Sequence, residues 1–286
     1  IVFGILLLIG FNFIILTNST EFSFEYIKFK KPELLSFNYL PNFTAGLTFF
    51  VAVAATNLFH QGNWQRVYAA KDNRTLKYSL TISFIIIIPI VFLMGFSGLI
   101  ATSKNPNVIP DLAFFTLLLK NNIWMLSLVI LFLAISLTVS SIDTLINAIS
   151  SLIIVDGNKI FKARGNYFNF SKYFIIILSI ITFFVASYGF SILYLFLLAD
   201  LFCCAAVLTV FYSFYNKSIN EKNAYISIIV GLFIGLLLFP STDFSKSLLI
   251  GVLFPTTYFP DFMSQSLLFL SFSFATLTPI FIWKIR

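Results

Sequence analysis

Long runs of apolar residues, separated by short polar connections, repeat along the whole chain. A helix needs about 20 mainly apolar residues to cross a hydrocarbon layer about 30 Å thick. The pattern therefore predicts an all-α, polytopic membrane helix bundle of about eight transmembrane helices, in a single membrane domain. The predicted spans are 1–17, 44–60, 80–102, 124–154, 173–189, 194–215, 224–240 and 263–283.

Composition agrees with this pattern and argues against several other classes of protein. Of the 286 residues, 59% are hydrophobic and only 10% are charged, which is outside the range of soluble domains. The net charge of +7 is therefore interpreted by its placement between spans, and not as a sign of nucleic-acid binding. One histidine and the adjacent Cys203 and Cys204 predict neither a disulfide nor a transition-metal centre, because neighbouring side chains on a helix point apart.

Lysine and arginine are distributed unevenly among the connections, which predicts the orientation in the membrane. If the spans alternate, twelve of the 18 basic residues lie on one side and six on the other. Since positive charge marks the cytoplasmic side, we expect a multi-pass protein of the cell's inner (plasma) membrane. The predicted cytoplasmic parts are 61–79, 155–172, 216–223 and the C-terminus.

The sequence begins inside an apolar run, IVFGILLLIG, and has no initiator methionine. This is typical of a chain whose N-terminal helices lie upstream. We therefore expect the missing N-terminal helices of the same protein to be partners of this fragment, and we expect the fragment alone to be inactive.

Polar side chains form a stripe along the predicted span 124–154. Five of them are spaced four, three, four and three residues apart and so share one face of a helix: Ser136, Ser140, Asp143, Asn147 and Ser150. Such a face fits close helix packing, because small hydroxyl residues let helices approach and hydrogen-bond. Asp143 and Asn147 favour a second interpretation, since ionisable groups inside a membrane usually face a cavity or a pathway.

Hydroxyl and carbonyl oxygens are hard donors that suit an alkali cation. A cage of such oxygens with little net charge holds Na⁺ weakly enough to release it, and ion-coupled transporters build such cages near disrupted helices. The spacing alone does not identify the ion.

Three stretches resemble the sodium:solute symporter family, in matching order and spacing. SLTVSSIDTLINAISSLIIVD (136–156) is similar to that family's eighth core helix. NLFHQGNWQRVYAAKDNRTLKYS (57–79) is similar to its sixth core helix and cytoplasmic exit, and NPNVIPDLAFFTLL (105–118) to an external loop. The resemblance implies the family's five-plus-five inverted-repeat transporter fold, with 1–17 as core helix five.

The resemblance also implies a sodium site with Na⁺ as the coupling ion, and no other metal or cofactor. The hydroxyls of Ser140 and Ser141 and the backbone carbonyl of Leu137 would be ligands. Carbonyls of core helix one, which is not in this sequence, would complete the site. Ser136, Asp143 and Asn147 would be accessory residues of the same stripe.

The family's sugar carriers present aromatic side chains from the sixth helix, and the corresponding places here, Val53 to Asn57, have none. The seventh-helix lysine of those carriers has no counterpart in 79–92 either, so the resemblance argues against a sugar. Val53, Thr56 and Asn57 are candidate substrate or gate residues. The nearby His60 either joins this polar group or caps the helix at the membrane interface.

Asp200 lies near the middle of the predicted span 194–215. A charged and unpaired carboxylate there would cost several kcal/mol. Asp200 is therefore either protonated, or it meets a cation, a polar helix or the substrate. In the resembled fold this helix lines the solute cavity, which makes Asp200 a further substrate or proton-site candidate.

Together these patterns predict a sodium-coupled secondary active transporter, a symporter that takes up a small organic solute by alternating access. Amino acids, carboxylates and urea-like compounds remain open as solutes. The alternatives are a solute-sensing membrane module of the same fold and an inactive truncated transporter. The expected partners are the solute, Na⁺ and the lipid bilayer, with no nucleic acid. An enzyme would need a nucleophile beside a base, or a metal cluster, and the sequence indicates neither.

Overall fold

The computed structural model shows an all-helical protein in the residues that it describes. These residues are 10, 27–29, 32–105, 107–119, 124–157, 159, 167–215, 220–254 and 260–284. Six described helices are long and apolar enough to cross a membrane: α3 (Leu40–Phe59), α5 (Asn73–Lys104), α7 (Trp124–Ser151) with its π-helical continuation η4 (Leu152–Asp156), α9 (Tyr167–Ser187), α10 (Ile192–Ser213) and α11 (Glu221–Leu238). The chain is a multi-pass membrane protein.

The remaining described elements are shorter. They are η1 (Pro32–Leu35), α4 (Gln61–Tyr68), η2 (Pro110–Leu112), α6 (Ala113–Leu118), η5 (Leu249–Leu253), α12 (Asp261–Gln265) and α13 (Leu267–Lys284). The predicted span 263–283 corresponds to α12 and α13, and α13 contains a shorter apolar stretch, Leu267–Ile282. The predicted span 1–17 lies outside the described residues, apart from Gly10. The inverted-repeat fold stays a prediction.

Local signals set where two of these helices begin. α3 carries Pro41 in its first turn, where a missing N–H is tolerated. α5 is capped by Asp72, whose Oδ1 accepts a hydrogen bond from the Thr75 backbone N–H at 2.6 Å. This bond to the Thr75 backbone, together with one to its side chain, lowers the pKa of Asp72. The segment 61–79, expected as a connection, is thus mostly helical, because α4 follows α3 almost directly and α5 begins early.

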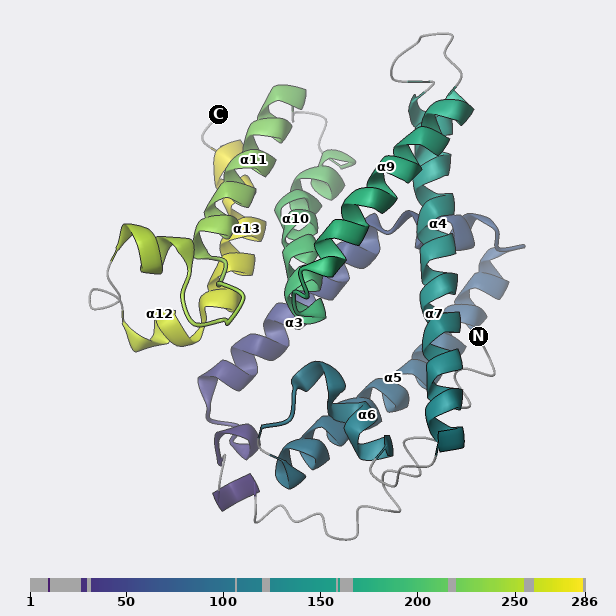
Figure 1. Cartoon of the computed structure of the whole chain (residues 1–286). Helices are drawn as coiled ribbons and strands as arrows, with labels where there is room; N and C mark the ends of the chain where they lie inside the picture. The colour runs from purple at the N-terminus through teal and green to yellow at the C-terminus, as the bar shows by residue number, and fades with distance from the viewer. Residues whose placement is uncertain are drawn as a thin grey trace. The chain divides into compact units, whose positions relative to one another are not determined.

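Contacts divide the chain into two compact units. One unit takes its described helices from 61–187, and in it α7 and α9 run in opposite directions at an angle and contact each other, while α4 packs against α7 (Figure 1). In the same unit α5 packs against α6. Ile100 and Ile130 form a small buried apolar cluster there, so most of the apolar surface of these helices faces outward, as lipid requires.

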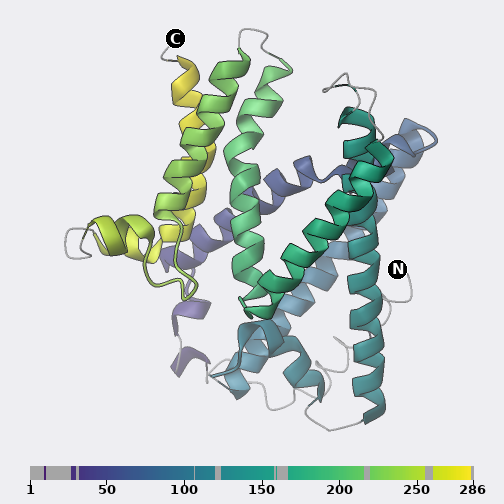
Figure 2. The ribbon, with the colours of Figure 1, turned by 45° about the horizontal axis from the view of Figure 1, so that its top comes forward.

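The other unit takes its residues from 32–60 and 188–286 and is built around α10. α10 contacts α3, α11 and α13, and α11 and α13 run antiparallel side by side (Figures 1 and 2). Leu197, Leu201 and Cys204 on α10 are fully buried in the centre of this unit.

Small polar side chains link neighbouring helices of this unit. The hydroxyls of Thr209 on α10 and Ser227 on α11 lie 3.3 Å apart. Ser271 Oγ on α13 donates a hydrogen bond to the Gly235 carbonyl on α11 at 2.7 Å. Hydrogen bonds of this kind stabilise helix pairs in membranes, where the hydrophobic effect between helices is absent.

Two glycines, one helical turn apart, let α11 and α13 approach closely. A Cβ at Gly231 would lie 2.8 Å from the Ala275 carbonyl oxygen and 3.2 Å from the Pro279 ring. A Cβ at Gly235 would lie 2.8 Å from the Ala275 Cβ. This is the small-xxx-small arrangement by which membrane helices pack backbone to backbone.

We expect Gly231→Ala to destabilise the unit by about 1–3 kcal/mol, the usual cost of overpacking, because the opposing atom is a backbone oxygen that cannot rotate away. Unfolding of the purified chain in detergent micelles measures this. Gly95→Ala on α5 is the matched control, since no atom lies within 4 Å of its Cβ position. Equal stability of the two variants would contradict the close contact between α11 and α13.

Candidate functional site

Thr56 on α3 and Asp200 on α10 form a polar pair in which Asp200 is buried and Thr56 is half-buried. Thr56 Oγ1 donates a hydrogen bond to Asp200 Oδ1 at 2.5 Å. Asp200 is only 1% exposed, and among the described residues its other oxygen, Oδ2, is buried with no hydrogen-bond partner. The sequence predicts both as candidate substrate or gate residues. The fold brings them together although they are 144 positions apart in the chain.

The surroundings of this pair are apolar. Ala52 and Ala55 from α3, with Leu201 and Cys204 from α10, are buried in one cluster there. Within the described part of the chain Asp200 makes no salt bridge. α3 carries no charged residue, and α13 carries only Lys284, at its last position. α10 itself carries no lysine or arginine, and α11 carries only Lys222, in its first turn.

An ionised carboxylate in such a place, without a counter-charge, costs several kcal/mol. Asp200 avoids this cost if it is protonated, or if Oδ2 accepts a hydrogen bond from a bound cation. The bond from Thr56 occupies Oδ1, so Oδ2 is the atom that remains for the proton or the cation.

The other candidates on α3 lie apart from this pair. Val53 is 42% exposed, and Asn57, also exposed, donates through Nδ2 to the Val53 carbonyl at 2.8 Å. His60 is the C-cap residue of α3, and its Nδ1 is buried without a hydrogen-bond partner among the described residues. The structure thus selects Thr56 from this group as the residue that contacts Asp200.

The polar stripe of α7 is exposed along its length from 136 to 147. The exposed residues are Ser136, Leu137, Ser140, Ser141, Asp143 and Asn147. Ser141 Oγ donates to the Leu137 carbonyl at 2.9 Å, so two of the three predicted sodium ligands lie in contact within one turn. The stripe presents hydroxyl and carbonyl oxygens on an open helix face.

At the end of this stripe α7 is tied to α4. Gln65 Nε2 donates to Ser151 Oγ at 2.9 Å, and Ser151 Oγ donates to the Ala148 carbonyl at 2.8 Å. The backbone then changes to the π-helix η4, a form often found at functional sites. The sequence indicates neither feature, because a π turn has no strong residue signature and the Gln65 contact joins distant segments.

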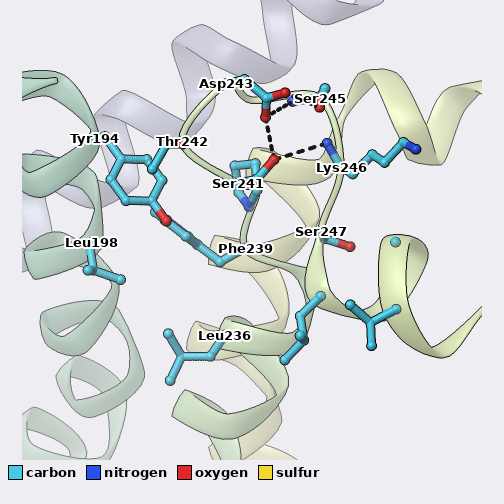
Figure 3. Close-up of a pocket in the computed structure, with 14 residues that line it drawn as sticks. Tyr194, Leu198, Leu236, Phe239, Ser241, Thr242, Asp243, Ser245, Lys246 and Ser247 are labelled. Atoms are coloured by element: carbon cyan, nitrogen blue, oxygen red, sulfur yellow. Dashed lines mark hydrogen bonds between the residues drawn. The ribbon is translucent and has the colours of Figure 1, made fainter. Parts of the chain in front are cut away.

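A second polar site, which the sequence does not single out, is a hollow of about 660 Å³ between α10 and the loop that follows α11 (Figure 3). Asp243 organises this loop. Ser241 Oγ and Ser245 Oγ both donate to its carboxylate, the latter at 2.6 Å. These two bonds, with one from the Ser245 backbone, lower the pKa of Asp243 to about 2, so the carboxylate is ionised at neutral pH. In the sequence, this site could have been recognised from the polar stretch STDFSKS between two apolar runs.

The fold and these polar groups define the class as a multi-pass helical membrane protein that keeps carboxyl and hydroxyl groups within its spans. A comparison with characterised proteins adds a distant likeness. Over 167 residues the chain is 28% identical to the spermidine transporter DUR31 of Candida albicans. The match covers 57% of this chain and 31% of the relative's length. No protein-family model matches the chain, and no solved structure matches it.

We expect Thr56→Val to destabilise the chain by about 1–3 kcal/mol, because it leaves both Asp200 oxygens buried without a donor. Unfolding in detergent micelles measures this. Thr48→Val is the control: it makes the same change on the same helix at a residue that is more deeply buried, but the Thr48 hydroxyl donates to the Thr44 carbonyl of its own helix. A loss at position 56 no larger than that at position 48 would contradict the structural role of the pair.

Proposed function

We propose that this chain is part of a sodium-coupled secondary active transporter that takes up a small organic amine by alternating access. The observation that carries the proposal is the exposed polar face of α7, on a helix long and apolar enough to cross a membrane. Such polar groups are costly in hydrocarbon and usually mark an ion or substrate pathway. The distant likeness to a protein named as a spermidine transporter supports transport over catalysis.

For the coupling ion, the proposal uses the oxygens of one turn of α7. The Leu137 carbonyl and the hydroxyls of Ser140 and Ser141 are neutral donors, which suit a weakly held alkali cation. Other parts of the whole transporter would supply the remaining ligands.

For the solute, the proposal uses Asp200. An ammonium group bound at Oδ2 would neutralise the buried carboxylate and satisfy its unpartnered oxygen, since charge-assisted hydrogen bonds are the strong ones. A carboxylate solute would instead place two like charges in an apolar region. Spermidine, the solute in the relative's name, is a polyamine of the required class.

We expect Ser140→Ala combined with Ser141→Ala to lower sodium-dependent uptake about tenfold or more at low sodium, because each lost oxygen ligand costs about 1–3 kcal/mol. Uptake of labelled spermidine into proteoliposomes containing the whole transporter measures this. Thr138→Ala is the matched control, because Thr138 is an exposed hydroxyl residue of α7 that is not among the proposed ligands and bonds to the Ala134 carbonyl. Unchanged sodium activation in the double variant would reject the sodium site.

We expect Asp200→Asn to weaken spermidine uptake by about tenfold or more, as for loss of a charged hydrogen-bond partner. Asparagine keeps the shape and can still accept from Thr56, so the change removes charge with little repacking. Sodium activation of the residual uptake should persist. Wild-type spermidine uptake in this variant would exclude Asp200 as the amine site, and binding without transport in the unmodified protein would favour a sensing module.

A further inference from the structure

The hollow between α10 and the loop after α11 has the dimensions of a small-molecule site. Its volume of about 660 Å³ falls within the range of about 300–1,000 Å³ that is usual for ligand pockets. Tyr194 and Leu198 project into it from α10, Phe239 from the end of α11, and the loop supplies hydroxyl and carboxyl groups on the opposite side (Figure 3).

Tyr194 and Phe239 supply the aromatic rings that line the hollow, and Phe244 packs against Tyr194 without lining it. Tyr194, which is half-buried, lies with its ring centre 5.5 Å from that of Phe239 and 6.0 Å from that of Phe244. Phe244 has a φ of 58°, a left-handed conformation that bulky residues rarely adopt and that is found where the surroundings over-determine it. Packing of Phe244 thus holds the loop against Tyr194, and the hydrogen bonds of Asp243 to Ser241 and Ser245 fix the conformation of the loop itself.

The Asp243 carboxylate gives the hollow a negative charge that no salt bridge among the described residues neutralises. Asp243 is ionised at neutral pH. Lys246 also borders the hollow, but Figure 3 shows its side chain extending away from Tyr194 and Asp243. An aromatic face beside an unpaired carboxylate is the arrangement that attracts an organic cation, through the ring quadrupole and through charge.

We propose that this hollow is a docking site for an organic ammonium ion, with Asp243 providing the charge and Tyr194 the aromatic face. The site deepens the proposed function, because an amine solute would be bound here before it reaches the membrane interior. Its occupancy requires neither a sodium gradient nor transport, so binding tests it separately.

The test is equilibrium binding of labelled spermidine to the purified chain in detergent micelles, at low and at high salt. We expect Asp243→Asn to weaken binding about tenfold or more and to remove most of its salt dependence, because the charge is lost while the loop hydrogen bonds can persist. Tyr194→Leu should weaken binding about 2- to 30-fold, whereas Tyr194→Phe, which keeps a ring, should stay near the unmodified chain.

Two matched controls separate this site from others. Lys246→Gln changes a charge on the same loop and should leave spermidine binding unchanged or slightly stronger. Asp200→Asn removes the deeper carboxylate. The part of spermidine binding that depends on Asp243 should remain intact in this variant. Unfolding of each variant in the same detergent confirms that the chain remains folded.

The proposal is overturned if Asp243→Asn binds spermidine as the unmodified chain does, or if Lys246→Gln weakens spermidine binding as much as Asp243→Asn does. The two proposals can fail separately. Sodium-dependent uptake that survives Asp243→Asn with unaltered affinity would sustain the transporter and reject the docking site. If the whole protein binds spermidine in an Asp243-dependent way but transports nothing, the docking site is sustained and the transporter is rejected.

Discussion

Hydrocarbon offers polar groups no water, so every polar group on a membrane-crossing helix needs a partner within the protein. In the unit of α3, α10, α11 and α13 this requirement is met between helices: Thr209 lies against Ser227, Ser271 donates to the Gly235 carbonyl, and Thr56 donates to Asp200. The bond from Ser271 reaches the backbone of the neighbouring helix and therefore needs the two helices to lie close together. The glycine contact between α11 and α13 provides that proximity for Ser271, so packing and polar pairing in this unit depend on each other.

The same constraint indicates which polar groups of the spans could bind a ligand: those that lack a partner or lie exposed. Asp200 Oδ2 is buried without a partner among the described residues, and the stripe of α7 lies open on its helix. A serine or threonine hydroxyl can donate a hydrogen bond to a backbone carbonyl of its own helix, as Ser141 does. A carboxylate oxygen cannot do this unless it is protonated. A proton, cation or solute bound at these atoms would lower the free energy of the protein, which is why the proposed function is built on them.

Two aspartates illustrate how environment assigns different roles to one residue type. Asp243 lies in a loop where three hydrogen bonds keep it ionised, whereas Asp200 lies among apolar side chains with one donor. Both proposed amine sites involve α10, since Tyr194 and Asp200 are six residues apart, about 9 Å along a helix axis. Because one helix contributes to both sites, their separation along its axis is constant.

The sequence by itself determined the membrane class, the positions of the long apolar helices and the shared face of the stripe on α7, because helical periodicity is a local property of the chain. It also marked Asp200, since the cost of a buried carboxylate can be judged from its apolar neighbours. It left unrecognised the spacing of Gly231 and Gly235, which acquires meaning only against Ala275 and Pro279 on another helix. Only the tertiary structure decided that Thr56 and not Asn57 meets Asp200, and that Tyr194 faces the Asp243 loop, because contacts between distant segments depend on how helices pack and not on the order of residues along one of them.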